Sequence, residues 1–153
     1  MKQLFYSFIY PYLYYCLRVW GGANVTHRQK LIILQKKALR IINKQPYLAH
    51  TSNLFFHNGI LKLDDLYKLK VGIYMFENRN IDQFRSTHVF NTRHRSNLVP
   101  VFQRLGATQN SITFMGPKIW NEIPADIRDS HSNQSFKLKF KNYLLSLYSP
   151  TRL

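Results

Sequence analysis

Two adjacent aspartates, Asp64 and Asp65, are the residues whose types and spacing best suit catalysis. Neighbouring aspartates hold two metal ions in nucleotidyl transfer, but such a site needs at least one further carboxylate, usually from an upstream strand. Residues 1–63 contain no Asp or Glu, so this sequence supplies none. Acidic side chains are also favoured in the first turn of a helix, where they face the positive end of the helix dipole. We therefore interpret the pair as a helix start.

The other reactive side chains lack the spacing of a metal or catalytic site. A zinc site needs several thiolate and imidazole ligands, and the chain has a single cysteine, Cys16, in an apolar aromatic stretch that indicates an inert thiol. One cysteine also excludes an intramolecular disulfide and favours a reducing compartment. No phosphate-binding loop or hydrolase motif is present. We predict no catalytic site, metal or cofactor. The histidines, interpreted as surface residues, are His27, His50, His57, His88, His94 and His131.

A set of cations on one predicted helix, residues 27–44, is the remaining candidate. Lys36, Arg40 and Lys44 recur every four residues, with Lys30 and Lys37 beside them. Such a row advances by about 6 Å per step, which is similar to the phosphate spacing along a nucleic-acid strand, so it can follow a backbone without reading bases. The ordinary alternative is a solvated face. Surfaces normally mix both signs of charge, however, and this half of the chain has no acid. We therefore predict that these five cations bind nucleic acid.

The elements that position these residues are mainly helices. The strongest pattern is that of helix 27–44, where apolar side chains at three- and four-residue steps predict an inward stripe of Leu31, Leu34, Ala38, Ile41 and Ile42. A short β-hairpin is expected from Leu98–Phe102 and Ser111–Met115. The other predicted elements are a helix over 4–20, bent near Pro11, that ends at Gly21-Gly22, a short helix within 46–62 that stops at Gly59, a helix from Asp64 to about Asn78, a flexible loop over 79–97, a helix that starts at Gly116-Pro117, and a helix over 135–148.

The net charge and the first 20 residues limit the classes of partner that the chain can have. The chain of 153 residues has 22 Lys and Arg against 7 Asp and Glu, a formal charge of +15, of which +9 lies in residues 1–63. Such a charge attracts polyanions, with nucleic acid first and an anionic membrane surface as the rival. Residues 1–20 are about as long as a membrane span, but Pro11, Arg18 and several tyrosines interrupt them and no signal-peptide cleavage site follows. We expect no membrane span, no signal peptide, and a cytoplasmic or nuclear location.

Several segments together resemble the C-terminal part of reverse transcriptases from non-LTR (LINE-type, jockey-like) retrotransposons. Their order and spacing cover nearly the whole chain, and Leu34–Ile42 is similar to the family's basic thumb helix. The segments are Tyr10-Pro11-Tyr12-Leu13 with Val19-Trp20-Gly21-Gly22, then Leu34–Ile42, Gly59–Leu63 with the Asp64-Asp65 helix, Asn91-Thr92-Arg93, Gly116–Asn121 with Ile123-Pro124, and Ser135-Phe136-Lys137.

The resemblance implies a thumb-like helical bundle that grips a template–primer duplex through its phosphates, with Lys36, Lys37 and Arg40 at the matching motif positions. The family's fingers and palm, with their metal-binding aspartates, would precede Met1, so the chain resembles a non-catalytic fragment whose exposed aromatic surface a missing palm would cover. The implied organisation is residues 1–78 as an aromatic helix plus basic thumb-like bundle, 79–97 as a loop, and 98–153 as a small hairpin with C-terminal helices. The alternatives are an inert relic of a degraded element and a basic membrane-surface protein anchored by residues 1–20.

Overall fold

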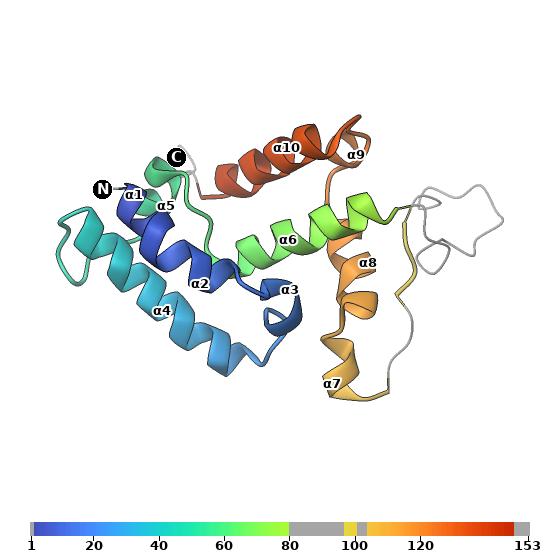
Figure 1. Cartoon of the computed structure of the whole chain (residues 1–153), viewed down its shortest axis with the longest axis horizontal. Coiled ribbons are helices and arrows are strands. Elements are labelled where there is room, and N and C mark those ends of the chain that lie inside the picture. Colours follow the sequence, from blue (N-terminus) through green and yellow to red (C-terminus); the bar gives the residue numbers. More distant parts are fainter. Residues whose placement is uncertain (1, 80–96, 101–103, 149–153) are drawn as a thin grey trace. The chain divides into compact units, whose positions relative to one another are not determined.

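The computed structural model describes residues 2–79, 97–100 and 104–148, and it is mainly helical, as predicted (Figure 1). The helices up to residue 79 are α1 (Lys2–Leu4), the π-helix η1 (Phe5–Ile9), α2 (Tyr10–Tyr14), α3 (Leu17–Trp20), α4 (Val25–Ile42), α5 (Ser52–Asn58) and α6 (Leu63–Glu77). The later helices are α7 (Gly106–Gln109), α8 (Ile112–Glu122), α9 (Ala125–Arg128) and α10 (Asn133–Ser146). The predicted helices over 27–44, from Asp64 and over 135–148 are therefore confirmed to within a few residues.

The chain divides into two compact units, which are described separately. Unit 1 comprises Met1–Tyr67 with Lys141–Leu153, and unit 2 comprises Lys68–Phe140. In unit 1, α4 packs against η1 and α5, and the N-terminal segment runs beside α4 (Figure 1). Phe5, Leu39 and Phe55 are fully buried there. The basic helix is therefore held on both sides by apolar contacts.

The helix predicted over residues 4–20, with a bend near Pro11, continues without a gap through α1, η1 and α2, and it is interrupted only between α2 and α3. Pro11 has no N–H to donate within a helix, and the wider π-helical turn of η1 ends just before it. The interruption follows α2, where Cys16 adopts a left-handed conformation with φ 48° and the Trp20 indole donates to the Tyr15 carbonyl at 2.7 Å. Gly21 follows α3 with φ −66°, so it does not adopt the left-handed conformation that commonly ends a helix. A Cβ at Gly21 would overlap the Tyr67 ring and the Leu17 carbonyl, so close packing is what requires glycine there.

The predicted β-hairpin is also wrong within the residues that the structure describes. Ser111 precedes α8, so Ile112 to Met115 are helical, and residues 101 and 102 of the other predicted strand lie outside the described residues. The Leu98 backbone, which a partner strand would have paired, is bonded by one side chain instead. Its N–H donates to Asn121 Oδ1 and its carbonyl accepts from Asn121 Nδ2, both at 2.9 Å. Pro117, predicted in a first helical turn, lies inside α8.

An aromatic cluster forms the core of unit 2. Phe136 of α10 stacks on Phe76 of α6 with ring centroids 4.6 Å apart, and Trp120 of α8 lies 5.9 Å from Phe136. The buried residues of α10 recur every four positions, at Phe136, Phe140 and Leu144. This helical spacing explains why the segment forms a helix, although lysines alternate with apolar residues over 136–141 as they would in a strand.

Two sequence predictions fall largely outside the described chain. Between its two end residues, the loop over 79–97 is not described, and Asn91-Thr92-Arg93 lies within that gap.

Among residues 2–79, 97–100 and 104–148, no helix combines the length and the apolar character that crossing a membrane requires.

Candidate nucleic-acid interface

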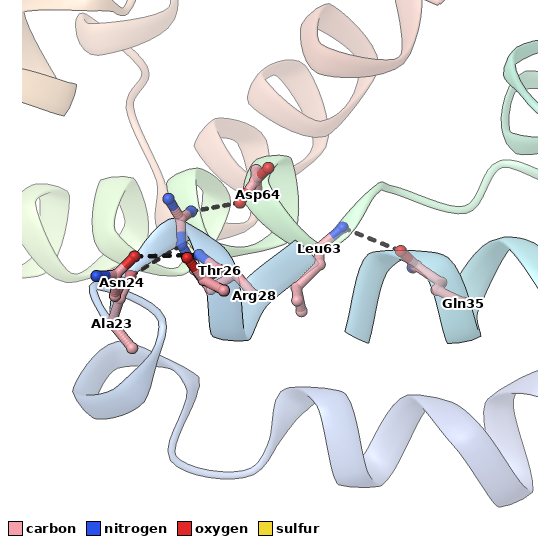
Figure 2. A network of polar contacts seen from close by, with 7 residues as sticks. All are labelled: Ala23, Asn24, Thr26, Arg28, Gln35, Leu63 and Asp64. Atoms are coloured by element: carbon pink, nitrogen blue, oxygen red, sulfur yellow. Dashed lines mark hydrogen bonds and ion pairs between the residues drawn. The ribbon is translucent and has the colours of Figure 1, made fainter. Parts of the chain in front are cut away.

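Helix α4 is fixed at its start by polar contacts that Figure 2 shows together. Asn24 caps the helix, since its side-chain oxygen accepts from the Thr26 N–H at 3.1 Å. Arg28 donates through Nε to the Ala23 carbonyl at 3.1 Å and forms an ion pair with Asp64 at the start of α6. These contacts set which side of the helix faces the rest of unit 1.

A buried glutamine fixes the helix at its centre. The side chain of Gln35 is 2% exposed, and its Nε2 donates to the Leu61 carbonyl at 2.9 Å while its Oε1 accepts from the Leu63 N–H at 3.1 Å. One amide therefore satisfies two backbone groups of the segment that leads into α6, and Figure 2 shows the bond to the Leu63 N–H. The buried residues of α4 are Ile32, Gln35 and Leu39.

The predicted apolar stripe is therefore misplaced around the helix. Leu34 is 58% exposed and Ile41 is 76% exposed, although both were expected to face inward. The physical reason is that a polar residue, Gln35, occupies the centre of the inward face, which a count of apolar positions assigns to the surface. The side of α4 opposite the buried residues is called the α4 outer face, and its members are Lys30, Ile33, Leu34, Lys37 and Ile41.

The five predicted cations do not form one row. Lys36 lies one turn after the buried Ile32 and is half-buried. Lys30 and Lys37, seven residues apart, share the α4 outer face, where Lys30 is exposed and Lys37 is half-buried. Arg40 is half-buried, and its Nε donates to the Ala49 carbonyl at 2.9 Å. The predicted step of four along Lys36, Arg40 and Lys44 is not a single face, because the helix ends at Ile42.

The end of α4 places Lys44 in an uncommon conformation. Its N–H donates to the Ile41 carbonyl at 3.1 Å, and the Gln45 N–H donates to the Arg40 carbonyl at 2.9 Å. This pair of bonds is a Schellman motif, whose left-handed position is usually occupied by glycine. Lys44 occupies it with φ 52° and is exposed. The chain thus keeps a cation at a position where a side chain costs stability.

Beyond Lys44 a tight turn carries an exposed tyrosine between cations. The Ala49 N–H donates to the Pro46 carbonyl at 3.0 Å, which closes the turn, and Tyr47 lies at its tip with 70% of its surface exposed. Lys37 Nζ lies 6.0 Å from the centroid of the Tyr47 ring, and the Arg40 guanidinium carbon lies 5.9 Å from it. We call Lys37, Arg40 and Tyr47 the Tyr47 platform. Tyr47 was not among the predicted site residues, and its only signal in the sequence is a position after Pro46 in a segment rich in cations.

The acids of unit 1 are engaged in internal contacts. Its sequence holds eleven Lys and Arg but only two acids, Asp64 and Asp65. Asp64 pairs with Arg28, and Asp65 accepts a hydrogen bond from the Tyr148 hydroxyl. Burial and that bond to the Asp65 carboxylate raise the pKa of Tyr148 well above its ordinary value. In the part of the chain that the structure describes, no carboxylate pairs with Lys30, Lys37 or Lys44.

The aspartate pair lies in the first turn of α6, as predicted. Among the described residues, no three His, Cys, Asp or Glu side chains are grouped as metal ligands.

A second surface of unit 1 is aromatic. Tyr10 stacks on Tyr14 with centroids 5.1 Å apart and lies 5.2 Å from Tyr6. Burial, with smaller contributions from Tyr14 and Tyr6, raises the pKa of Tyr10 to about 12. The exposed large side chains of this segment, called the N-terminal apolar surface, are Leu4, Phe8, Tyr12, Tyr15 and Val19.

The arrangement suits an extended anion, because Lys30, Lys37 and Lys44 lie on a helix and its following turn and pair with no acid among the described residues. Comparison of the chain with protein-family models, with curated proteins and with solved structures finds no match.

Proposed function

We propose that this chain is a non-catalytic, thumb-like segment of a non-LTR retrotransposon reverse transcriptase that grips template–primer nucleic acid through its phosphates. One observation carries the proposal. Unit 1 holds eleven Lys and Arg against two acids, and both acids are taken up by internal contacts. The positive surplus is therefore left for solvent or for a polyanion. Phosphate contacts of this kind supply affinity that does not depend on base sequence.

The α4 outer face is suited to a strand backbone in two respects. Lys30 and Lys37 are about 10 Å apart along the helix axis, so they reach different phosphates. Between them lie exposed apolar side chains, Ile33 and Leu34, which can cover the C–H edges of the sugars. Since Gln35 and Arg28 anchor the opposite side of the helix, these groups are held in place before binding.

Salt titration tests the proposal. The triple variant Lys30→Gln, Lys37→Gln, Lys44→Gln removes three charges without touching the buried side of α4. If each lysine meets one phosphate of a B-form primer–template duplex, the slope of log K against log salt becomes shallower by about 2.7. Fluorescence anisotropy with a labelled duplex, repeated at several salt concentrations, measures that slope.

A matched control separates a binding face from bulk charge. Lys118, Lys137 and Lys139 are exposed residues of unit 2, and their change to Gln lowers the net charge by the same amount. The proposal requires the α4 set to lose much more affinity and slope than this control set. Equal losses would show that charge alone attracts the duplex and would overturn the proposed face.

The N-terminal apolar surface supports a second candidate, binding to an anionic membrane surface. Tyrosine suits a membrane interface because its ring is apolar and its hydroxyl is polar. Flotation with anionic vesicles, compared for the wild type and the double variant Phe8→Gln, Tyr12→Gln, tests it. Deleting residues 1–20 would be a poor test, since Phe5, Leu13 and Leu17 are buried. Unchanged flotation of the double variant would reject this candidate.

A further inference from the structure

We propose that the Tyr47 platform stacks an unpaired nucleobase next to the duplex, so that the substrate class is a junction between duplex and single strand. This inference rests on the proposed function, because it places the base beside phosphates held by α4. It assigns a role to Tyr47, which the phosphate-binding proposal does not use.

Exposure of the ring is the first observation. Tyr47 is 70% exposed, although tyrosine rings are large and mostly apolar and are usually at least half-buried. A ring with both faces covered would not expose that much surface, so at least one face is open. Leu48, the next residue in the turn, is exposed as well. Tyr47 and Leu48 therefore present a flat apolar surface that no described residue covers.

Position is the second observation. The turn is closed by the Ala49 N–H on the Pro46 carbonyl, and Arg40 holds it to the helix through the Ala49 carbonyl at 2.9 Å. Lys37 and Arg40 lie about 6 Å from the ring centroid, within the range at which cations are attracted to an aromatic face. The ring is thus held against α4 in an orientation that is set before any ligand binds.

Charge is the third observation. Arg40 donates through Nε to the Ala49 carbonyl of the turn. Among the described residues, its terminal N–H groups have no hydrogen-bond acceptor and no ion-pair partner. Lys37 and Lys44 add two further cations beside the same turn, and residues 1–63 contain no acid. In a nucleotide, one sugar separates the base from its phosphate. A stacked base on Tyr47 would bring that phosphate to these cations, and this combination of aromatic ring and basic groove is how single strands are generally bound.

Because Lys37 belongs both to the α4 outer face and to the Tyr47 platform, the two surfaces are continuous. A paired duplex on the α4 outer face has its bases stacked on one another and offers none to Tyr47. An overhanging strand at the duplex end does offer one. Stacking on an aromatic side chain does not discriminate between bases or between DNA and RNA.

The test compares three duplexes of equal paired length: a blunt one, one with a short thymidine overhang, and one with an abasic overhang of the same phosphate number. Tyr47→Ala should weaken binding of the thymidine overhang about five- to 150-fold, the range expected for loss of one stacked base. Binding of the blunt and abasic duplexes should stay unchanged. Tyr47→Phe keeps the ring and should keep the affinity. Tyr12→Ala, at a tyrosine of α2 that is 81% exposed, is the control.

Two further arms complete the experiment. A uridine overhang on an RNA strand should show the same loss, since the ring recognises the base. A 2-aminopurine base in the overhang should lose fluorescence on binding to the wild type and keep it with Tyr47→Ala. Equal binding of the thymidine overhang by wild type and Tyr47→Ala would overturn the inference. If Tyr47→Ala weakens all three duplexes alike, the ring supports the turn and stacks no base.

The outcomes distinguish this inference from the proposed function. Should the triple lysine variant weaken the blunt duplex while Tyr47→Ala has no effect, only the stacking role fails. Should the triple lysine variant bind the blunt duplex as well as the wild type, the phosphate grip itself fails. Thermal unfolding of Tyr47→Ala checks that the exposed substitution leaves the fold intact.

Discussion

A substitution of Gln35 tests most directly what fixes the side of α4 that faces solvent. Its amide is 2% exposed and bonds both the Leu61 carbonyl and the Leu63 N–H. The change Gln35→Met keeps the length, the approximate volume and the helix propensity of the side chain. It removes both hydrogen bonds and leaves two buried backbone groups without a partner.

The magnitude follows from those two groups. A buried polar group that loses its partner costs about 1–3 kcal/mol, so Gln35→Met should lower the free energy of unfolding by about 2–6 kcal/mol. Domains of this size are stable by about 5–15 kcal/mol, and the loss is therefore easy to detect. Urea denaturation followed by circular dichroism measures it. Hydrogen exchange of the Leu63 N–H should accelerate by a larger factor than exchange of amides in unit 2.

The same substitution on the exposed side of the helix is the control. Gln29→Met lies on α4 as well, and Gln29 is exposed. It should change the free energy of unfolding by less than about 0.5 kcal/mol, as most surface substitutions do. If Gln35→Met is as stable as Gln29→Met, the amide does not hold α4 against the segment before α6, and our account of the outward face is refuted.

Two further predictions concern the end of α4 and the end of α10. Lys44→Gly should stabilise the fold by about 1 kcal/mol in thermal or urea unfolding, because glycine adopts the left-handed conformation without the steric cost that Lys44 bears. The same variant should weaken duplex binding, and a gain in both would contradict the assigned role. Tyr148→Phe should be less stable than the wild type at pH 7, since Tyr148 donates to Asp65. Folding raises the pKa of Tyr148, first through burial, so its contribution is complete below the unfolded value near pH 10 and declines above it by up to about 1.4 kcal/mol per pH unit. The difference between wild type and Tyr148→Phe in urea unfolding should therefore shrink from pH 9 to pH 11, and a constant difference would refute the assignment.

Strong local signals made much of the helical order predictable. Asn24 caps α4 as its position suggests, and Gly59 ends α5 in the left-handed conformation, with φ 63°, as expected of a stop. The prediction of a β-hairpin failed because the local sequence pattern cannot show which distant residue will bond the backbone. A side chain on α8, Asn121, satisfies the Leu98 backbone that a strand would otherwise have paired.

The candidate site was harder to predict, because its geometry depends on one buried amide. Hydrophobic periodicity places Leu34 and Ile41 inside and Gln35 outside, and the structure reverses this because Gln35 bonds two backbone groups. That reversal also changes what the helix presents to a ligand. Cations alone would offer attraction to any polyanion, whereas cations with exposed Ile33 and Leu34 between them favour a surface that alternates charge with apolar edges. A sugar–phosphate backbone has that alternation.

The two acids of unit 1 decide which of its cations remain available. Arg28 lies on α4 like Lys37, but Asp64 pairs with it, so Arg28 serves to orient the helix. The Tyr148 hydroxyl donates a hydrogen bond to the Asp65 carboxylate, so that acid is also engaged within unit 1. An acid near the outer face would instead neutralise Lys37 and hold it by an ion pair. Because Asp64 and Asp65 bond to Arg28 and Tyr148, neither carboxylate neutralises a lysine of the α4 outer face. The helix is therefore anchored on its inward side and keeps its positive charge on the outer face. That distribution of charge distinguishes a binding surface from a surface that is merely basic.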